Sequence, residues 1–215
     1  MIDIYTLMSL KSHYEKKCQE PSDINEHLPT LRAYASECEH VTEMGVRSVV
    51  SSYALVVPSV TKRLVQVDIQ PMSQQLNYFQ HLCAECGISC EFKCCDSVLV
   101  GKEPTDLLFI DTWHVYAHLK RELAAWHQYV RKYIIMHDTY VDGVFGESIR
   151  LNWNTATQAA ETGYPEDEIR MGLNQAIQEF VIQQPEWEIH RVFVNNNGLT
   201  ILKKKTDIGP SVVTN

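Results

Sequence analysis

The sequence of 215 residues has no apolar segment long enough to span a membrane and no block rich in lysine and arginine. Even the apolar run 53–57 is interrupted by Pro58, far short of the roughly 20 residues that a membrane helix needs. Lys203-Lys204-Lys205 is the only basic run in a chain of net charge −8, which argues against tight binding to nucleic acid. The first residues also lack the basic and apolar regions of a signal peptide. We therefore expect a cytoplasmic protein that acts on a small or neutral substrate and binds neither nucleic acid nor a membrane.

Two motifs of common α/β enzymes are missing as well. After the first predicted strand the chain continues as Val46-Arg47-Ser48-Val49-Val50, without the second and third glycines of Gly-x-Gly-x-x-Gly. A nicotinamide-dependent oxidoreductase is therefore not expected. The sequence Gly-x-Ser-x-Gly of the α/β hydrolases is also absent.

The chain does contain seven cysteines, five of which lie between residues 83 and 95. An odd number of cysteines is typical of a reducing compartment. A zinc site is the alternative reading of the cluster. However, Cys83 and Cys86 fall on a predicted helix, without the turn between them that a zinc knuckle requires. Because free cysteine is often buried, we interpret the cluster as structural.

Hydrophobic periodicity predicts N-terminal helices in residues 1–39, as a lid or brace, and a main domain at 40–205. The predicted strands are His40–Glu43, Arg63–Asp68, Ile88–Cys94, Asp106–Asp111, Lys132–His137, Trp187–Val194 and Leu199–Lys204. The predicted helices of the main domain are Ser51–Val57, Ser73–Glu85, Val115–Tyr129 and Asp167–Gln183. We expect an irregular segment at 140–165 and a disordered tail at 206–215.

This order of elements predicts an α/β fold. Helices would cover both faces of a seven-stranded, mostly parallel, Rossmann-like doubly wound sheet. The last two strands would form an antiparallel hairpin, because Asn197-Gly198 is a strong hairpin turn signal.

Polar residues follow two of the predicted strands directly. Asp111-Thr-Trp-His114 comes after the apolar run 107–110, and His137-Asp138 comes after the apolar run 133–136. Continuous apolar runs are typical of buried parallel strands, and open α/β sheets bind ligands beyond the carboxyl ends of such strands. We therefore expect two carboxylates and two imidazoles over one crevice, a set suited to a divalent cation and a general base.

The segment from Glu43 to Ser51 resembles the first motif of class I S-adenosylmethionine-dependent methyltransferases. It is most similar to the branch of the macrolide-sugar and rhamnosyl O-methyltransferases and their cephalosporin-cluster relatives. In that branch an acidic residue and a glycine end the first strand, and a serine opens the next helix. The resemblance implies that Glu43, Gly45 and Ser51 bind the cofactor. Val49-Val50 stand where relatives often carry a further glycine.

Later segments match the same family in the same order, over roughly residues 27–204. Asp68 ends the second strand, where the family's acidic residue binds the ribose hydroxyls, and Asp96 follows the third, where the family contacts adenine. The segment 107–114 resembles the fourth motif, with Thr112 in place of a glycine. The segments 134–139 and 191–200 resemble the next motif and the final hairpin.

The resemblance implies an S-adenosylmethionine-dependent, metal-assisted O-methyltransferase that acts on a sugar hydroxyl, in a glycan or in a glycoside of a deoxysugar such as rhamnose. His114 matches the general base. The resemblance implies that Asp111, three residues earlier, is a second catalytic residue and also binds the cofactor. Metal-dependent members use the positions of Asp111, His137 and Asp138 as ligands. Carboxylates favour magnesium, whereas the imidazole of His137, where close relatives carry a carboxylate, suits manganese or zinc better. The alternatives are that His137 does not bind the metal directly or that no metal is bound.

A non-catalytic relative of the same fold, serving as a binding module or partner subunit, is the alternative because the first motif is poor in glycine. A homodimer, or a domain of a larger glycan-modifying protein, is also compatible with the sequence.

Overall fold

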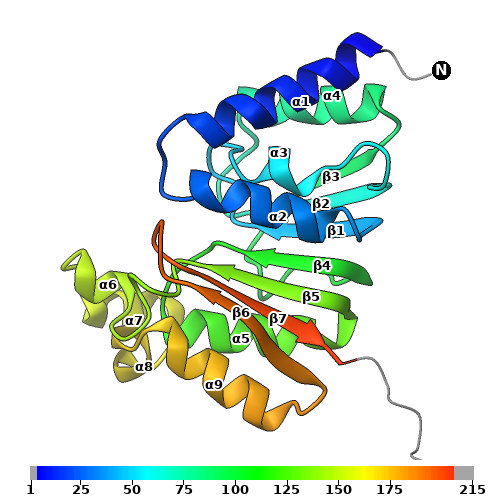
Figure 1. The fold of residues 1–215 in the computed structure, drawn as a ribbon. Coiled ribbons are helices and arrows are strands. Elements are labelled where there is room, and N and C mark those ends of the chain that lie inside the picture. Colours follow the sequence, from blue (N-terminus) through cyan, green and yellow to red (C-terminus); the bar gives the residue numbers. More distant parts are fainter. Residues whose placement is uncertain (1–3, 206–215) are drawn as a thin grey trace, which may run out of the picture.

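The computed structural model describes residues 4–205, so the predicted disordered tail at 206–215 lies outside the described residues. A seven-stranded sheet with the order β3-β2-β1-β4-β5-β7-β6 forms its centre (Figure 1). Neighbouring strands among β1–β5 pair in parallel, and β7 runs antiparallel to both β5 and β6. The strands are β1 (His40–Met44), β2 (Arg63–Asp68), β3 (Ser89–Cys94), β4 (Thr105–Ile110), β5 (Val130–His137), β6 (Trp187–Phe193) and β7 (Leu199–Lys204). The predicted fold class is confirmed.

Helices cover both faces of the sheet because successive strand residues point to opposite sides. In β4, Leu107 and Phe109 join one apolar core, and Leu108 and Ile110 join the other. The first core lies under α1 (Ile4–Gln19), η1 (Asn25–His27), α2 (Leu28–Ala35), α3 (Ser52–Leu55) and α4 (Gln74–Glu85). The second lies under α5 (Tyr116–Trp126), followed by η2 (His127–Tyr129), and under α9 (Leu173–Gln183). Within the described residues, no helix is both long and apolar enough to cross a membrane.

The N-terminal helices α1 and α2 pack against other helices that cover the same face of the sheet. Both α1 and α2 contact α3, and α1 also contacts α4. Arg32 of α2 donates hydrogen bonds to the carbonyl oxygens of Tyr53 and Val56, at 3.3 and 3.2 Å. The division into an N-terminal lid or brace and a main domain at residue 40 stays a prediction.

The prediction of an irregular segment at 140–165 is wrong, because this segment contains two short helices, α6 (Glu147–Arg150) and α7 (Thr155–Thr162). The side chain of Asn154 accepts a hydrogen bond from the N–H of Thr157 and so caps α7, which ends at Gly163 with φ 73°. Helices of one or two turns offer too few positions for a periodic apolar pattern, so the sequence did not reveal them.

The single helix predicted at 167–183 is also wrong, because it is divided into α8 (Glu166–Arg170) and α9. Met171 pairs with Phe145 in an isolated bridge. A Cβ on Gly172 would lie 2.5 Å from the carbonyl oxygen of Asp142. The break therefore lets the backbone of Asp142 and Gly143, which follow β5, approach Gly172 between α8 and α9.

The remaining elements agree with the prediction to within a few residues. Asp111, predicted as the last residue of its strand, lies just beyond β4. Cys86, predicted to fall on a helix, directly follows the last residue of α4. None of the seven cysteines, all of which lie within the described residues, is assigned to a disulfide.

Candidate functional site

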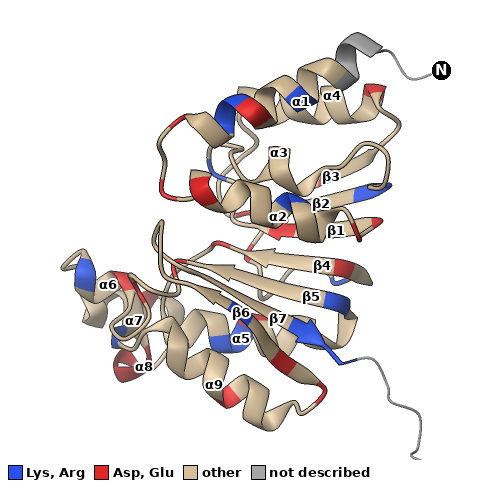
Figure 2. Cartoon of the chain, viewed as in Figure 1, with Lys and Arg blue, Asp and Glu red and all other residues tan. Residues whose placement is uncertain are grey.

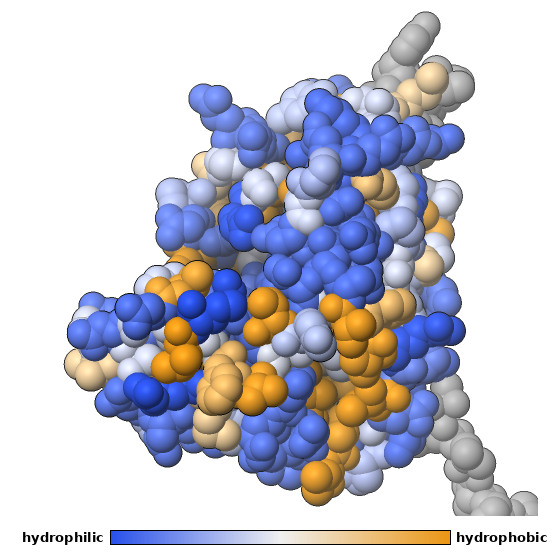
Figure 3. Space-filling view, turned by 60° about the vertical axis from the view of Figure 1, so that its left-hand side comes forward, coloured by the Kyte–Doolittle hydropathy of each residue, from blue (hydrophilic) through white to orange (hydrophobic). Residues whose placement is uncertain are grey.

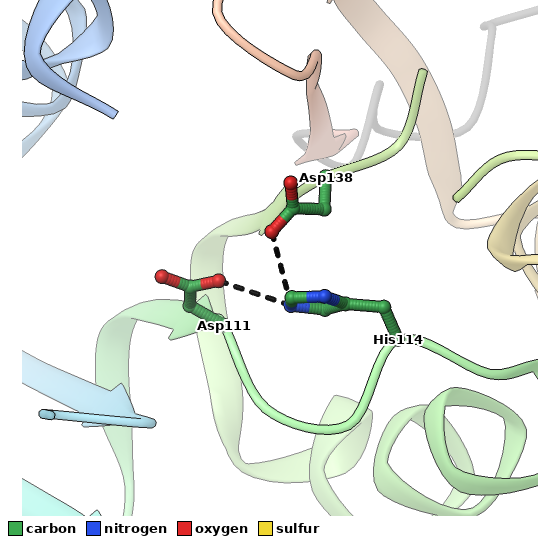
Figure 4. A group of neighbouring side chains, drawn as sticks. All are labelled: Asp111, His114 and Asp138. Carbon is green, nitrogen blue, oxygen red and sulfur yellow. Dashed lines mark hydrogen bonds and ion pairs between the residues drawn. The ribbon is translucent and has the colours of Figure 1, made fainter. Parts of the chain in front are cut away.

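Two neighbouring parallel strands bring the polar residues of the fourth and fifth predicted strands together. Ile110 pairs with Met136 at the carboxyl ends of β4 and β5, which places Asp111 beside His137. The Nε2 atom of His114 lies 3.1 Å from Oδ1 of Asp111 and 3.2 Å from Oδ2 of Asp138 (Figure 4). The Nδ1 atom of His137 lies 3.3 and 3.1 Å from the same two oxygens. The expected group of two carboxylates and two imidazoles is therefore assembled.

Charge pairing dominates the protonation of this group. Burial alone would lower the pKa of His137, but hydrogen bonds with Asp111 and Asp138 raise it to about 10. The pKa of His114 is likewise raised well above its ordinary value, against the effect of burial, mainly by Asp111 and Asp142. Burial would raise the pKa of Asp111, yet the two imidazoles hold it well below its usual range. Asp111 and the two imidazoles thus stabilise one another's charged forms.

Asp142 and Glu147 also face His114, and sequence reasoning missed both. Oδ2 of Asp142 lies 3.4 Å from Nδ1 of His114, and its fully buried carboxylate accepts two hydrogen bonds from Arg150, at 2.6 and 2.9 Å. Oε2 of Glu147 lies 3.8 Å from Nδ1 of His114, and the backbone N–H of Glu147 donates to the carbonyl oxygen of His114. The only signal available was a pair of acidic residues shortly after a strand end, within a segment predicted to be irregular.

The other nitrogen of His137 is held by the β6–β7 turn. Nε2 of His137 lies 3.2 Å from the carbonyl oxygen of Asn196. The side chain of Asn196 in turn accepts from the N–H of Glu26 and donates to the carbonyl of Ser22. The turn asparagines, which the sequence identifies as turn formers, therefore also connect the N-terminal segment to the site.

The chemistry of the donor atoms fits a divalent cation. One potential ligand atom from each of Asp111, His114 and Asp138 lies within 4.8 Å of the others. Oδ1 of Asp138 is buried without a hydrogen-bond partner among the described residues, while Oδ2 faces both imidazoles, so Oδ1 offers a cation an unused oxygen ligand. His137 borders the same oxygens but is only 1% exposed. The ligand set Asp111, His137 and Asp138 stays a prediction.

On the cofactor side, Gly45 connects the first motif directly to Asp111. Gly45 has φ +85°, and a Cβ there would lie 1.8 Å from the carbonyl oxygen of Asp111. The N–H of Asp111 donates to the carbonyl of Met44 at 2.8 Å. The missing side chain thus permits the ends of β1 and β4 to meet. Arg47 and Val49 also have positive φ, 41° and 60°, so the loop keeps a backbone shape typical of glycine without glycine.

Glu43 and Ser51 are buried rather than presented at the surface. The Glu43 carboxylate accepts hydrogen bonds from Ser51 at 2.6 Å, Ser52 at 2.6 Å and Gln66 at 2.9 Å. Burial raises the pKa of Glu43 to about 7. In this structure Glu43 ties α3 to β1 and β2, and direct contact of Glu43 or Ser51 with a cofactor stays a prediction.

Asp68, the last residue of β2, and Asp96, shortly after β3, are partly exposed, and both already bind backbone groups. Oδ2 of Asp68 accepts from the N–H groups of Val46 and Arg47, at 2.8 and 3.0 Å, and Oδ1 accepts from Gln70 at 2.8 Å. Oδ1 of Asp96 accepts from the N–H of Val98 at 2.7 Å. Asp68 therefore shapes the loop after β1, and its predicted role as ribose ligand would use its remaining acceptor capacity.

The comparisons with known proteins identify the fold. No family model matches the sequence, and no curated protein matches it. Among solved structures, it resembles the 1,6-didemethyltoxoflavin-N1-methyltransferase of Burkholderia thailandensis with bound 1,6-didemethyltoxoflavin and S-adenosylhomocysteine (TM-score 0.56, 12% identity, 94% of this chain and 88% of that chain). It also resembles an O-methyltransferase of Bacillus cereus in complex with S-adenosylhomocysteine (0.53, 13%, 90% and 91%). The N-terminal domain of EvdMO1, in the presence of S-adenosylhomocysteine and D-fucose, is similar too (0.51, 11%, 87% and 85%). At such identities the likeness establishes the shared fold.

Proposed function

We propose that this chain is an S-adenosylmethionine-dependent O-methyltransferase that acts on a sugar hydroxyl with the assistance of a divalent metal. The observation that carries the proposal is the imidazole of His114, held between Asp111 and Asp138 at the carboxyl end of a methyltransferase-type sheet. The compared structures with bound S-adenosylhomocysteine support the choice of cofactor, and the structure obtained in the presence of D-fucose supports a sugar acceptor.

The chain's own residues would divide the work between two sides of the site. Asp68 and Asp96 would bind the ribose and adenine of the cofactor beyond β2 and β3. A divalent cation, when bound by Asp111, His137 and Asp138, would lower the pKa of the acceptor hydroxyl and, by neutralising the carboxylates, that of His114. Nε2 of His114 would take the hydroxyl proton as the oxygen forms its bond to the methyl carbon and the carbon–sulfur bond breaks. Asp142, facing Nδ1, would stabilise the resulting imidazolium.

Exposed aromatic side chains in the segment after β5 support a carbohydrate acceptor. Tyr140, Phe145 and Trp153 are 65%, 66% and 46% exposed, and they flank Asp138 and Glu147 in the chain. Hydrophobic residues gather on the lower half of the face seen in Figure 3. Aromatic rings can pack against the apolar faces of a sugar while amide and carboxylate groups bind its hydroxyls.

The first test is binding and transfer by the whole chain. We expect calorimetry to detect S-adenosylmethionine and S-adenosylhomocysteine, and methyl transfer to deoxysugar glycosides to stop with a chelator. His114→Gln should lower kcat by about 10²–10⁴-fold, because the general base is lost, with the affinity for S-adenosylhomocysteine unchanged.

His81→Gln is the matched control, because His81 lies on the exposed side of α4, where it pairs with Glu85. Transfer that continues unchanged in His114→Gln would reject the assigned base, and transfer insensitive to chelation would reject the metal. Absence of binding to either cofactor form would favour a non-catalytic binding module or partner subunit. This is the second candidate because Val49-Val50 stand where relatives often carry a further glycine in the first motif. A homodimer or a place in a larger glycan-modifying protein stays a prediction.

A further inference from the structure

We infer that Glu122 is a positioning residue that sets the distance between the cofactor side and the acceptor side of the site. This inference rests on the proposed function, and it concerns a buried polar cluster that contains none of the residues assigned above. The cluster consists of Ser97, Thr112, His118 and Glu122.

Glu122 is the centre of the cluster. It lies in α5 and is fully buried. Its Oε1 accepts hydrogen bonds from the hydroxyls of Ser97 at 2.5 Å and Thr112 at 2.9 Å, and its Oε2 lies 3.0 Å from the same Thr112 hydroxyl. Nε2 of His118, one turn earlier in α5, lies 3.3 Å from Oε1 and 3.1 Å from the Ser97 hydroxyl. One carboxylate thus binds groups from two loops and from its own helix.

The two hydroxyls belong to loops that the sheet does not connect directly. Ser97 follows Asp96 after β3, and Thr112 follows Asp111 after β4. In the strand order, β2 and β1 lie between β3 and β4, so no ladder hydrogen bond joins these two strand ends. Glu122 of α5 joins the two loops instead, because it accepts hydrogen bonds from both Ser97 and Thr112. Trp126, one turn further along α5, strengthens it through an indole N–H that donates to the carbonyl of Ser97 at 2.8 Å.

The chemistry of the cluster also favours a specific role over simple packing. Burying a carboxylate costs free energy that an apolar side chain of similar size would not, so its presence is not explained by stability alone. Burial would lower the pKa of His118, yet its electrostatic interaction with Glu122 raises it. A satisfied buried network of this kind holds its members in one geometry. In the proposed enzyme that geometry fixes the adenine-side Asp96 relative to the acceptor-side Asp111.

Ser97→Ala and Thr112→Val each remove one connection and leave the other. With Ser97→Ala we expect the affinity for S-adenosylhomocysteine, measured by calorimetry, to fall about tenfold, with kcat at saturating cofactor largely kept, because one lost hydrogen bond to a charged group is of that order. With Thr112→Val we expect kcat to fall about tenfold, with the affinity for S-adenosylhomocysteine unchanged. Thr112→Ser, which keeps the hydroxyl, should restore kcat, and Glu122→Gln should alter both quantities.

Glu168→Gln is the control, because Glu168 makes surface ion pairs with Lys120 and Arg121 of the same helix α5. The inference is overturned if the two single variants change neither quantity, if both change affinity and kcat alike, or if Thr112→Ser fails to restore kcat while its thermal stability matches wild type. Wild-type protein that binds no S-adenosylhomocysteine would instead reject the proposed function, and this inference with it.

Discussion

At the scale of single residues, burial changes the pKa of Glu43 and so makes stability depend on pH. Its carboxyl group is surrounded by Ser51, Ser52 and Gln66, and burial raises its pKa to about 7 from an ordinary value of 4.5. Because the pKa is higher in the folded state, the folded chain binds the proton more tightly than the unfolded chain does. The contribution of protonated Glu43 to stability is fully present below pH 4.5 and is lost as pH rises through about 7.

Glu43→Gln should therefore change how stability depends on pH. The amide cannot ionise, so the free energy of unfolding of the variant, relative to wild type, should increase between pH 4.5 and 7. The ionisation accounts for about 3 kcal/mol as an upper value. Urea denaturation of both proteins at several pH values measures this difference, and a difference that does not vary with pH would contradict the assignment.

At the scale of elements, the loop between β1 and α3 controls where β4 ends. Gly45 allows the backbone of Asp111 to approach, and Asp68 holds the N–H groups of Val46 and Arg47. The loop therefore connects the end of β2 to the end of β4 across β1. A change in this loop should move Asp111 even though no side chain of the site is altered.

Gly45→Ala is expected to lose stability beyond the cost of backbone strain, and to lose activity. Gly163 is the matched comparison, because its φ of +73° is similarly left-handed but a Cβ there meets nothing within 4 Å. Gly163→Ala should cost about 1–2 kcal/mol, the usual penalty of a side chain in the left-handed region. Gly45→Ala should cost clearly more, because the added atom would collide with Asp111. Equal midpoints of denaturation for the two variants would refute this.

At the scale of the whole molecule, an acidic chain concentrates negative charge at one end of its sheet. The sequence carries 27 acidic and 19 basic residues, and Figure 2 shows the basic residues scattered over the described helices and strands. Around His114, by contrast, four carboxylates converge, those of Asp111, Asp138, Asp142 and Glu147. Arg150 pairs with Asp142, whereas Asp111 and Asp138 pair with the imidazoles of His114 and His137 and are the carboxylates that a cation would bind.

Added manganese should therefore stabilise the folded chain. At a concentration 100 times its Kd, the ion should add about 2.7 kcal/mol and raise Tm by roughly 5–10 °C. Asp138→Asn should remove most of this rise, whereas Asp167→Asn, on the exposed surface of α8, should keep it. Differential scanning calorimetry with manganese and with a chelator measures the effect, and an equal rise in both variants would exclude Asp138 as a ligand.

The sequence predicted the parts of the fold that have strong local signals. Apolar runs followed by polar residues located β4, β5 and the group of Asp111, His114, His137 and Asp138. The turn at Asn197-Gly198 located the hairpin of β6 and β7. These features depend on neighbouring residues in the chain, so periodicity and turn chemistry are sufficient to find them.

The tertiary structure alone decided which distant residues share a site. Asp142 and Glu147 reach His114 only because the break at Gly172 lets the segment after β5 fold back. Glu122 meets Ser97 only because α5 packs under strand ends that are not adjacent in the sheet. Such contacts depend on packing between elements far apart in sequence, which no local pattern of residues encodes.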